Sequence, residues 1–270
     1  MLTKLAYRSL VVAGVALAAG RVDAAPLRDT PVRAEPKLIV SAAGRKFNVS
    51  VMRVRLDQVR VRVGLAGGRV GRTQDLAGIA EDHKAEAAIN GSFFNAYESG
   101  PIKNPGHLVI VGGEDRFVGS IGTIIGFTAD GEVRMERSKE VIAQRGSWGV
   151  KPVLREGEDF WSRVEEGLGC GPRLLKDGKV CLNAAAEGFS SPKVLTASAA
   201  RSAVGITTDG WLLFVTTDAT MRQLADVMKA LQATQAMNLD GGASSGLWVR
   251  GKYLRRPGRP VSNALLVLKR

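Results

Sequence analysis

The chain has 270 residues, of which 45% are hydrophobic, so it can bury a substantial core without metal or disulfide support. Its 38 Lys and Arg residues exceed its 26 Asp and Glu residues, and the formal charge of +12 favours an anionic substrate or partner. Nucleic acid is not expected, because the basic residues are dispersed and no helix-turn-helix or zinc-finger spacing occurs. The charge could also simply suit a protein that works near anionic envelope polymers.

The N-terminus has the pattern of a secretory signal peptide. Lys4 and Arg8 precede an uncharged apolar run from Leu10 to Ala19, and Val22-Asp23-Ala24 provides small residues where a signal peptidase cleaves. The run is shorter than the roughly 20 residues that a membrane-spanning helix needs. We therefore predict a signal peptide over residues 1–24 and an exported protein, periplasmic or extracellular, without a membrane span after cleavage. A retained N-terminal anchor is the alternative.

Hydrophobic periodicity predicts strands first and then a helix. Apolar and polar residues alternate between Lys37 and Ala66, which is typical of half-buried strands, with a turn at Asp57-Gln58. Thr73 can cap a following helix, and a strand should run from Ala85 to Ile89. One face of that helix carries Leu76, Ile79, Ala80 and His83. His83 is thus expected to be a helix residue rather than a ligand.

A second helix has clearer signals. Thr220 and Gln223 form a capping box, and apolar residues recur with helical spacing at Leu224, Val227, Met228 and Leu231. The helix leads into a strand from Ala236 to Leu239. Both helices thus precede a short strand and a polar glycine turn, so the two strand ends could converge on one site.

Three Asp-Gly pairs separate apolar runs and predict hairpins at Asp130-Gly131, Asp177-Gly178 and Asp209-Gly210. Many antiparallel strands with few helices predict an α+β fold with largely antiparallel or mixed sheets and a single catalytic domain. Residues 25–84 should supply its first strands and helix. The charged region from Arg137 to Glu166 is the expected insertion or flap.

Cys170 and Cys181 are the only cysteines. They could close a small loop in an oxidising compartment, but a hairpin about Asp177-Gly178 would not place them opposite each other, so the pairing stays open. With only two histidines in the chain, a cysteine nucleophile is not expected.

Three clusters combine residues suited to phosphate and sugar chemistry. Asn238-Leu239-Asp240-Gly241-Gly242-Ala243-Ser244-Ser245 places a carboxylate before glycines whose N–H groups can approach a phosphate. Asn90-Gly91-Ser92-Phe93-Phe94 sets amide and hydroxyl groups beside aromatic rings, as sugar sites require. Arg201 begins an apolar strand and can bind a phosphate bidentately. Each cluster taken alone also fits an ordinary turn or strand end.

Together with Gly169-Cys170-Gly171-Pro172-Arg173 and Pro260-Val261-Ser262-Asn263-Ala264-Leu265, the clusters resemble the phosphodiester glycosidase family from about Ala85 to the C-terminus, so residues 85–270 are the expected catalytic region. Ser92 and Ala243 stand where that family often has glycine. The resemblance implies hydrolysis of the C–O bond between a sugar's anomeric carbon and a phosphodiester. The substrate could be an N-acetylglucosamine-1-phosphodiester or a related envelope or exopolysaccharide glycan.

Such a leaving group is a weakly basic anion and needs little protonation. Arg201 can neutralise the departing phosphate, Asp240 can deliver water or attack the anomeric carbon, and Asp218 is the candidate second carboxylate. The predicted substrate-binding residues are Asn90, Gly91, Ser92, Asn238, Gly241, Gly242, Ser244, Ser245 and Asn263.

A cofactor is not required by this chemistry, although Asp240, Asn238 and Asp218 offer oxygen ligands suited to calcium or magnesium. Zinc is not expected with so few His and Cys residues. Two other functions remain open. One is a non-catalytic glycan-binding or exopolysaccharide-assembly protein of the cell envelope, and the other is a metal phosphodiesterase that breaks the P–O bond.

Overall fold

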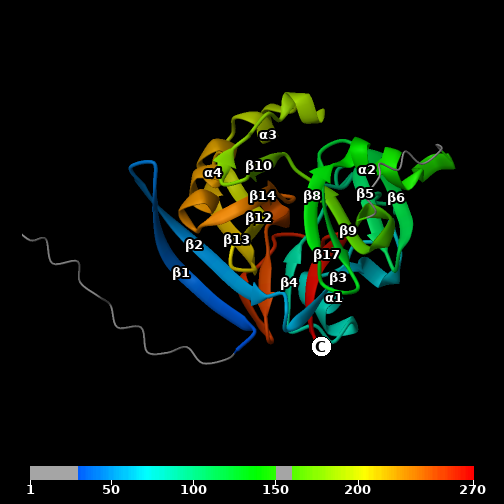
Figure 1. The fold of residues 1–270 in the computed structure, drawn as a ribbon, viewed down its shortest axis with the longest axis horizontal. Coiled ribbons are helices and arrows are strands. Elements are labelled where there is room, and N and C mark those ends of the chain that lie inside the picture. Colours follow the sequence, from blue (N-terminus) through cyan, green and yellow to red (C-terminus); the bar gives the residue numbers. More distant parts are fainter. Residues whose placement is uncertain (1–29, 150–159) are drawn as a thin grey trace, which may run out of the picture. The chain divides into compact units, whose positions relative to one another are not determined.

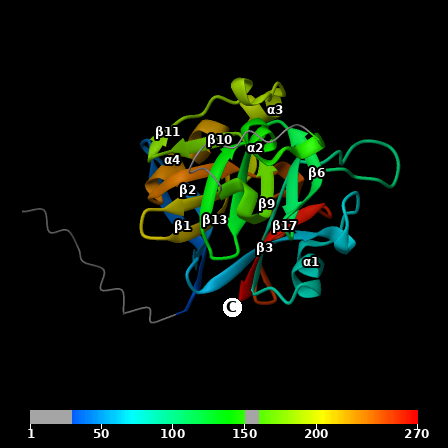
Figure 2. The ribbon, with the colours of Figure 1, turned by 45° about the vertical axis from the view of Figure 1, so that its right-hand side comes forward.

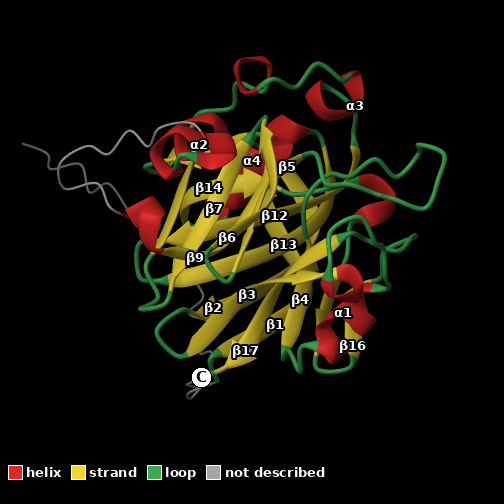
Figure 3. Ribbon diagram, turned by 90° about the vertical axis from the view of Figure 1, so that its right-hand side faces the viewer, coloured by secondary structure: helices red, strands yellow, loops and turns green. Residues whose placement is uncertain are grey.

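Antiparallel sheets form the framework of residues 30–149 and 160–270, the parts of the chain that this computed structural model describes (Figure 1). Every strand pairing in these residues is antiparallel, and short helices lie around the sheets (Figure 3). Residues Pro31–Arg270 form one structural unit. These observations confirm the predicted α+β fold.

The first sheet has seven strands. In spatial order they are β1 (Val32–Ala42), β2 (Arg45–Arg55), β13 (Trp211–Ala219), β12 (Ala199–Thr207), β14 (Ala233–Asn238), β10 (Arg173–Lys176) and β11 (Lys179–Val180). Helix α4 (Met221–Ala230) covers one face. Its capping box is confirmed, because Thr220 Oγ1 accepts from the Gln223 N–H while Gln223 Oε1 accepts from the Thr220 N–H. Leu224, Val227 and Met228 are fully buried against the sheet.

The second sheet has five strands. They are β16 (Lys252–Arg255), β15 (Leu247–Val249), β4 (Ala87–Asn90), β17 (Asn263–Lys269) and β3 (Val59–Leu65). Helix α1 (Leu76–Asp82) packs Leu76 and Ile79 against it. The predicted cap at Thr73 is wrong. Gln74 forms an isolated antiparallel β-bridge with Val261, so its backbone is not helical. The helix therefore begins only after Asp75, whose carbonyl accepts from the Ile79 N–H.

The third sheet also has five strands. They are β6 (Glu114–Ser120), β5 (His107–Val111), β9 (Val164–Cys170), β7 (Thr123–Thr128) and β8 (Val133–Arg137). Helix α2 (Ser138–Arg145) and a 3-10 turn at Phe160–Arg163 bury Val141, Ile142, Phe160 and Trp161 against it. Both ends of the predicted flap, Arg137 to Glu166, therefore belong to the core, because their apolar side chains pack against this sheet. Residues 150–159 of the predicted flap lie outside the described residues.

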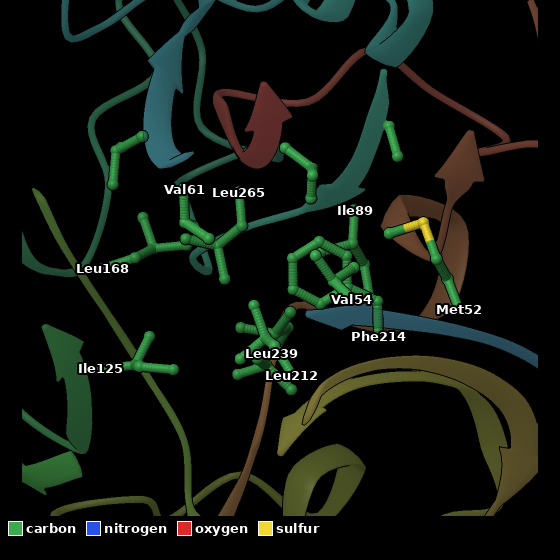
Figure 4. Packing of buried hydrophobic residues seen from close by; sticks show 14 of the residues in the cluster. Met52, Val54, Val61, Ile89, Ile125, Leu168, Leu212, Phe214, Leu239 and Leu265 are labelled. Atoms are coloured by element: carbon green, nitrogen blue, oxygen red, sulfur yellow. The ribbon is translucent and has the colours of Figure 1, made fainter. Parts of the chain in front are cut away.

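Side chains from all three sheets form one core (Figure 4). Met52 and Phe214 come from the first sheet, Ile89 and Leu265 from the second, and Leu168 from the third. A close-packed interior resists small displacements. The core therefore fixes the strand ends on which the candidate site is built.

The turn predictions hold. Asp130-Gly131 joins β7 to β8, Asp177-Gly178 joins β10 to β11, and Asp209-Gly210 joins β12 to β13. Asp57-Gln58 lies between β2 and β3, which belong to different sheets. The remaining helical segments are α3 (Pro192–Leu195) and 3-10 turns at Ala66–Gly68, Ser147–Gly149, Ala185–Glu187 and Gly242–Ser244.

The predicted signal peptide, residues 1–24, lies outside the described residues. Within the described residues, no helix has both the length and the apolar character needed to span a membrane.

Candidate active site

The ends of β4 and β14 and the start of β17 meet at one point and bring the predicted clusters together. The Asp240 N–H donates to the Gly91 carbonyl at 2.9 Å, and the Gly91 N–H donates to the Asn263 carbonyl at 2.9 Å. The Leu239 N–H donates to the carbonyl of Ser202, in β12, at 2.8 Å. Residues predicted from separate parts of the sequence are thus direct neighbours.

Asn90 is fully buried at this junction. Its Nδ2 donates to the carbonyl of Asp240 at 2.7 Å, while its Oδ1 accepts from Ser202 Oγ at 2.7 Å and from the Gly246 N–H at 3.0 Å. A buried amide with its groups satisfied in this way fixes its partners. Asn90 therefore holds the Asp240 turn against both the first and the second sheet.

Gly91, Ser92 and Asn263 connect this junction to the third sheet. Asn263 Oδ1 accepts from the Ser92 N–H at 2.8 Å, and Ser92 Oγ donates to the carbonyl of Gly169, in β9, at 2.6 Å. A Cβ atom on Gly91 would lie only 2.0 Å from Asn263 Oδ1. The position therefore requires glycine because Asn263 approaches so closely. Ser92 and Asn263 are buried, so the structure places both in the internal network.

Asp240 has only 4% of its surface exposed. Its Oδ1 accepts from the Gly241 N–H at 2.8 Å, and its Oδ2 lies 3.5 Å from Arg259 Nη2. Burial raises the pKa of Asp240 to about 6, although Ser244, Arg259 and the Gly241 N–H each lower it. A carboxyl group that titrates this close to neutrality can exchange a proton or attack as a carboxylate.

Arg201 lies beside the glycine turn and is 3% exposed. Its Nε donates to the Ala219 carbonyl at 3.2 Å and its Nη2 to the Ala197 carbonyl at 2.6 Å, while burial lowers its pKa. A Cβ atom built on Gly241 would lie 3.7 Å from Arg201 Cδ. The structure thus places this cation beside the turn, with Nε and Nη2 bonded to main-chain carbonyls.

Arg259 is a site residue that the sequence reasoning missed. Its Nε donates to Ser244 Oγ at 2.8 Å, and its guanidinium carbon lies 5.0 Å from the ring centre of Phe94 and 5.1 Å from that of Tyr97. Its side chain is 21% exposed. Arg259 directly precedes the Pro260–Leu265 segment used for the family resemblance, but an arginine in a loop is not distinctive in a chain with 38 basic residues.

The remaining predicted binding residues line the same turn. Ser245 Oγ lies 3.2 Å from Ser202 Oγ, and Gly242 has a φ of +60° with nothing near a built Cβ. Asn238 Nδ2 donates to the Gly171 carbonyl at 2.8 Å. Its buried Oδ1 has no partner among the described residues, so it retains an unused acceptor.

Phe93, which follows Ser92, belongs to a cluster of aromatic rings. Phe93 packs against His107 and Phe189, with ring centres 5.6 and 6.0 Å away. Burial lowers the pKa of His107 to about 4, so it is neutral at physiological pH. Tyr97, in contrast, is 87% exposed. It belongs to the loop between β4 and β5, which projects away from the sheets beside β6 (Figure 2).

Asp218 is placed differently from Asp240. It lies near the end of β13, opposite Ala200 of β12, with a side chain that is 73% exposed. Its Oδ1 accepts from Arg255 Nη2 at 2.9 Å. The hydrogen bonds that join Asn90, Asp240 and Ser202 do not include Asp218. The structure thus brings the other clusters together but leaves this carboxylate on an exposed strand end.

The described residues contain no cluster of three or more His, Cys, Asp or Glu side chains able to hold a metal ion. Of the three proposed oxygen ligands, Asp240 faces Arg259 and Asp218 binds Arg255, while Asn238 donates to Gly171. A calcium or magnesium site made from these three residues therefore stays a prediction.

Cys170 and Cys181 are both free thiols. Cys170 lies at the end of β9, whereas the Cys181 N–H pairs with the carbonyl of Leu174 after the β10–β11 hairpin. Burial, and the nearby Asp240 carboxylate, raise the pKa of the Cys170 thiol well above its usual value. Cys170 is therefore a packing residue beside the site and a poor nucleophile.

The sequence profile of the phosphodiester glycosidase family matches residues 83–268, which include the whole junction. The chain belongs to the phosphodiester glycosidase family. No curated protein sequence matches it. The clusters around Asn90, Arg201 and Asp240 all lie within the matched residues, and family membership supports a hydrolase as the general class of activity.

Solved structures share the fold at low sequence identity. A hypothetical protein from Synechocystis has a TM-score of 0.73 and 20% identity, over 90% of this chain and 64% of that chain. The zebrafish N-acetylglucosamine-1-phosphodiester alpha-N-acetylglucosaminidase catalytic domain, auto-inhibited by its pro-peptide, has a TM-score of 0.66 and 18% identity over 90% and 85%. A Burkholderia pseudomallei protein described as a candidate exported protein has a TM-score of 0.62 and 18% identity over 84% and 76%. The chain thus spans less than two thirds of the length of the Synechocystis protein.

Proposed function

We propose that this protein hydrolyses the bond between a sugar's anomeric carbon and the oxygen of a phosphodiester. The observation that carries the proposal is Asp240, a buried carboxyl group with a pKa of about 6 beside a glycine turn and an arginine. An N-acetylglucosamine-1-phosphodiester is one candidate substrate, because a structural neighbour bears that name. A phosphodiester within an envelope or exopolysaccharide glycan is the other.

Asp240 supplies the charge that the reaction needs at the anomeric carbon. When it is ionised, it can attack that carbon or remove a proton from the attacking water, and its negative charge stabilises an oxocarbenium-like transition state. The Gly241 N–H and Arg259 hold the carboxylate in one orientation. A fixed carboxylate lowers the barrier because little reorganisation is needed during the reaction.

Arg259 is better placed than Arg201 to contact the leaving phosphate. Arg201 donates to two main-chain carbonyls and is almost completely buried, whereas Arg259 is partly exposed beside Asp240. A guanidinium can bind two phosphate oxygens at once. In this proposal Arg259 binds the phosphate directly, and Arg201 positions the turn and adds positive potential beside it.

Phe94 and Tyr97 offer apolar faces next to Arg259. Sugar rings bind where apolar surface lies beside a few polar groups. The highly exposed Tyr97 ring is therefore the proposed platform for the sugar, with Asn90, Ser92 and Asn263 holding the floor behind it in place.

A panel of sugar-1-phosphodiesters hydrolysed in oxygen-18 water tests the proposal. We expect release of free sugar with the label on the sugar, because the C–O bond breaks. Label on the phosphate would instead indicate a phosphodiesterase that breaks the P–O bond. If neither product appeared for any substrate, a glycan-binding or assembly protein would be the better description.

The pH dependence tests the role of Asp240 separately. Because its pKa is about 6, kcat/KM should rise as the pH increases through 6 and level off above it. In Arg259→Gln the rise should move to higher pH, because a nearby cation that lowers this pKa is gone. The pH profiles of both proteins, measured at saturating and at low substrate concentration, check this. An unchanged midpoint in Arg259→Gln would contradict the assignment.

We also propose that the protein is exported, on the basis of the N-terminal pattern and of the structural neighbour described as a candidate exported protein. The mature protein secreted by its native host should begin at Ala25. N-terminal sequencing would show this, and an intact Met1 on the secreted protein would contradict it.

A further inference from the structure

A pocket of about 420 Å³ lies beside Asp218. Thr216, which also lines it, pairs in the sheet with Ser202, so the pocket borders the hydrogen-bond network of the candidate active site. It is lined by residues of β1, β2 and β13 in the first sheet and of β16 in the second. The register of β1 shifts between Glu35 and Leu38, and Lys37, which lies in this irregular stretch, lines the pocket.

The polar groups of the pocket suit an acidic sugar. Thr216 is 1% exposed, and its Oγ1 is a buried atom without a hydrogen-bond partner among the described residues. Lys37 and Arg255 contribute two positive charges, whereas Asp218 contributes one negative charge and is already bonded to Arg255. The lining is therefore net positive, and the Asp218 carboxylate can still accept from sugar hydroxyls.

The unpartnered hydroxyl of Thr216 is itself evidence that a ligand binds in the pocket. A buried hydroxyl without a hydrogen bond costs free energy, so such groups usually have a partner. Valine has nearly the same shape as threonine and would avoid the cost. Thr216 is therefore explained if its hydroxyl acquires a partner when the pocket is filled.

The pocket is also close to Asp240 along the sheet. Asp218 of β13 pairs with Ala200 of β12, and a Cβ atom on Gly241 would lie 2.8 Å from the Ala200 carbonyl oxygen. Two strand spacings, about 10 Å, therefore separate Asp218 from the glycine turn. The chain from Arg255, which binds Asp218, to Arg259, which faces Asp240, connects the two places.

We infer that this pocket is a subsite for an acidic sugar residue of the glycan that carries the phosphodiester. The inference rests on the proposed function in one respect: the glycan bound in the pocket is the one whose phosphodiester lies at Asp240. The anionic group could be a uronate or a phosphate, because Lys37 and Arg255 would pair with either. A sugar bound here would anchor the substrate while the phosphodiester lies at Asp240.

Calorimetric titration of the mature protein tests this with three probes: trigalacturonic acid, a trisaccharide with one phosphorylated sugar, and neutral maltotriose. We expect at least one acidic probe to bind and maltotriose to bind much more weakly. Thr216→Val and Lys37→Ala should each weaken the acidic probe by about tenfold, the effect of one lost hydrogen bond to a charged or polar group. Lys46→Ala, a matched exposed lysine of β2 outside the pocket, should bind like the wild type.

Two further measurements keep the result interpretable. The melting temperature of Thr216→Val should not fall, because the hydroxyl has no partner to lose. Asp240→Asn should bind the acidic probe as the wild type does. The inference is overturned if the wild type binds neither acidic probe, if Thr216→Val binds as tightly as the wild type, or if Asp240→Asn abolishes binding. These titrations involve no hydrolysis, so failure of the hydrolysis panel with binding retained would refute the proposed function alone.

Discussion

Asp240→Asn is expected to lose turnover by roughly a thousandfold or more while the protein still folds and binds substrate. Asparagine preserves the shape of the side chain and can still accept the Gly241 N–H, so the substitution removes the charge alone. Single-turnover kinetics of the variant and of Asp209→Asn, an exposed aspartate of the β12–β13 turn, measure the effect against a matched control. Asp209→Asn should behave like the wild type.

Asp240→Asn should raise the stability of the protein at neutral pH although it lowers turnover. The pKa of Asp240 is raised by burial, so the folded protein holds a proton that the unfolded chain releases between about pH 4 and the folded value of about 6. The stability of the wild type therefore falls as the pH rises through this window, by about 3 kcal/mol at most. Asp240→Asn does not titrate and should be the more stable protein at neutral pH, with little advantage at pH 4. Denaturant unfolding at both pH values measures this.

Two outcomes would change the assignment. Turnover of Asp240→Asn within a few-fold of the wild type would transfer the catalytic role to another carboxylate, and Asp218 would be tested next. A variant that failed to fold at any pH would mark Asp240 as a structural turn residue.

Asn90→Ala is expected to have the second largest effect, on both stability and turnover. The substitution removes the partner of the Asp240 carbonyl, of Ser202 Oγ and of the Gly246 N–H, all at a buried junction. Leaving such groups unsatisfied should cost about 3 kcal/mol in unfolding free energy. Turnover should fall at least about tenfold at a temperature where the variant is folded, because the Asp240 turn loses its anchor.

Denaturant unfolding and kcat of Asn90→Ala check this prediction, with Asn104→Ala, an exposed loop asparagine, as the control. Asn104→Ala should match the wild type in both measurements. If Asn90 only bound a sugar hydroxyl, Asn90→Ala would raise KM without lowering stability, and the anchoring role would be wrong.

Local signals in the sequence predicted the elements that local contacts determine. The Thr220–Gln223 capping box and the Asp-Gly turns satisfy their hydrogen bonds within a few residues, so they formed as predicted. The helix cap at Thr73 failed because a distant segment, at Val261, pairs with Gln74 and delays the helix. Tertiary pairing overrode a local preference there.

The candidate site also has a part that the sequence predicted and a part that it did not. The convergence of Asn90 and Asp240 followed from two similar helix, strand and turn plans, and the family resemblance reinforced it. The contacts of Arg259 with Ser244 and Phe94 could not be predicted, because they depend on how a loop folds back across the sheet ends. The exposure of Asp218 likewise depends on which strand end Arg255 reaches.

The junction around Gly91 ties the site to the cooperative folding of the protein. Strands from all three sheets are connected there through Asn263, Ser202 and Gly169, so no sheet can detach without breaking hydrogen bonds beside Asp240. Regions held in this way open only with the whole domain, and the exchange of their amide hydrogens reports the global free energy of unfolding. Loss of activity on heating should therefore coincide with global unfolding, and engineering that strengthens any one sheet should protect the chemistry as well.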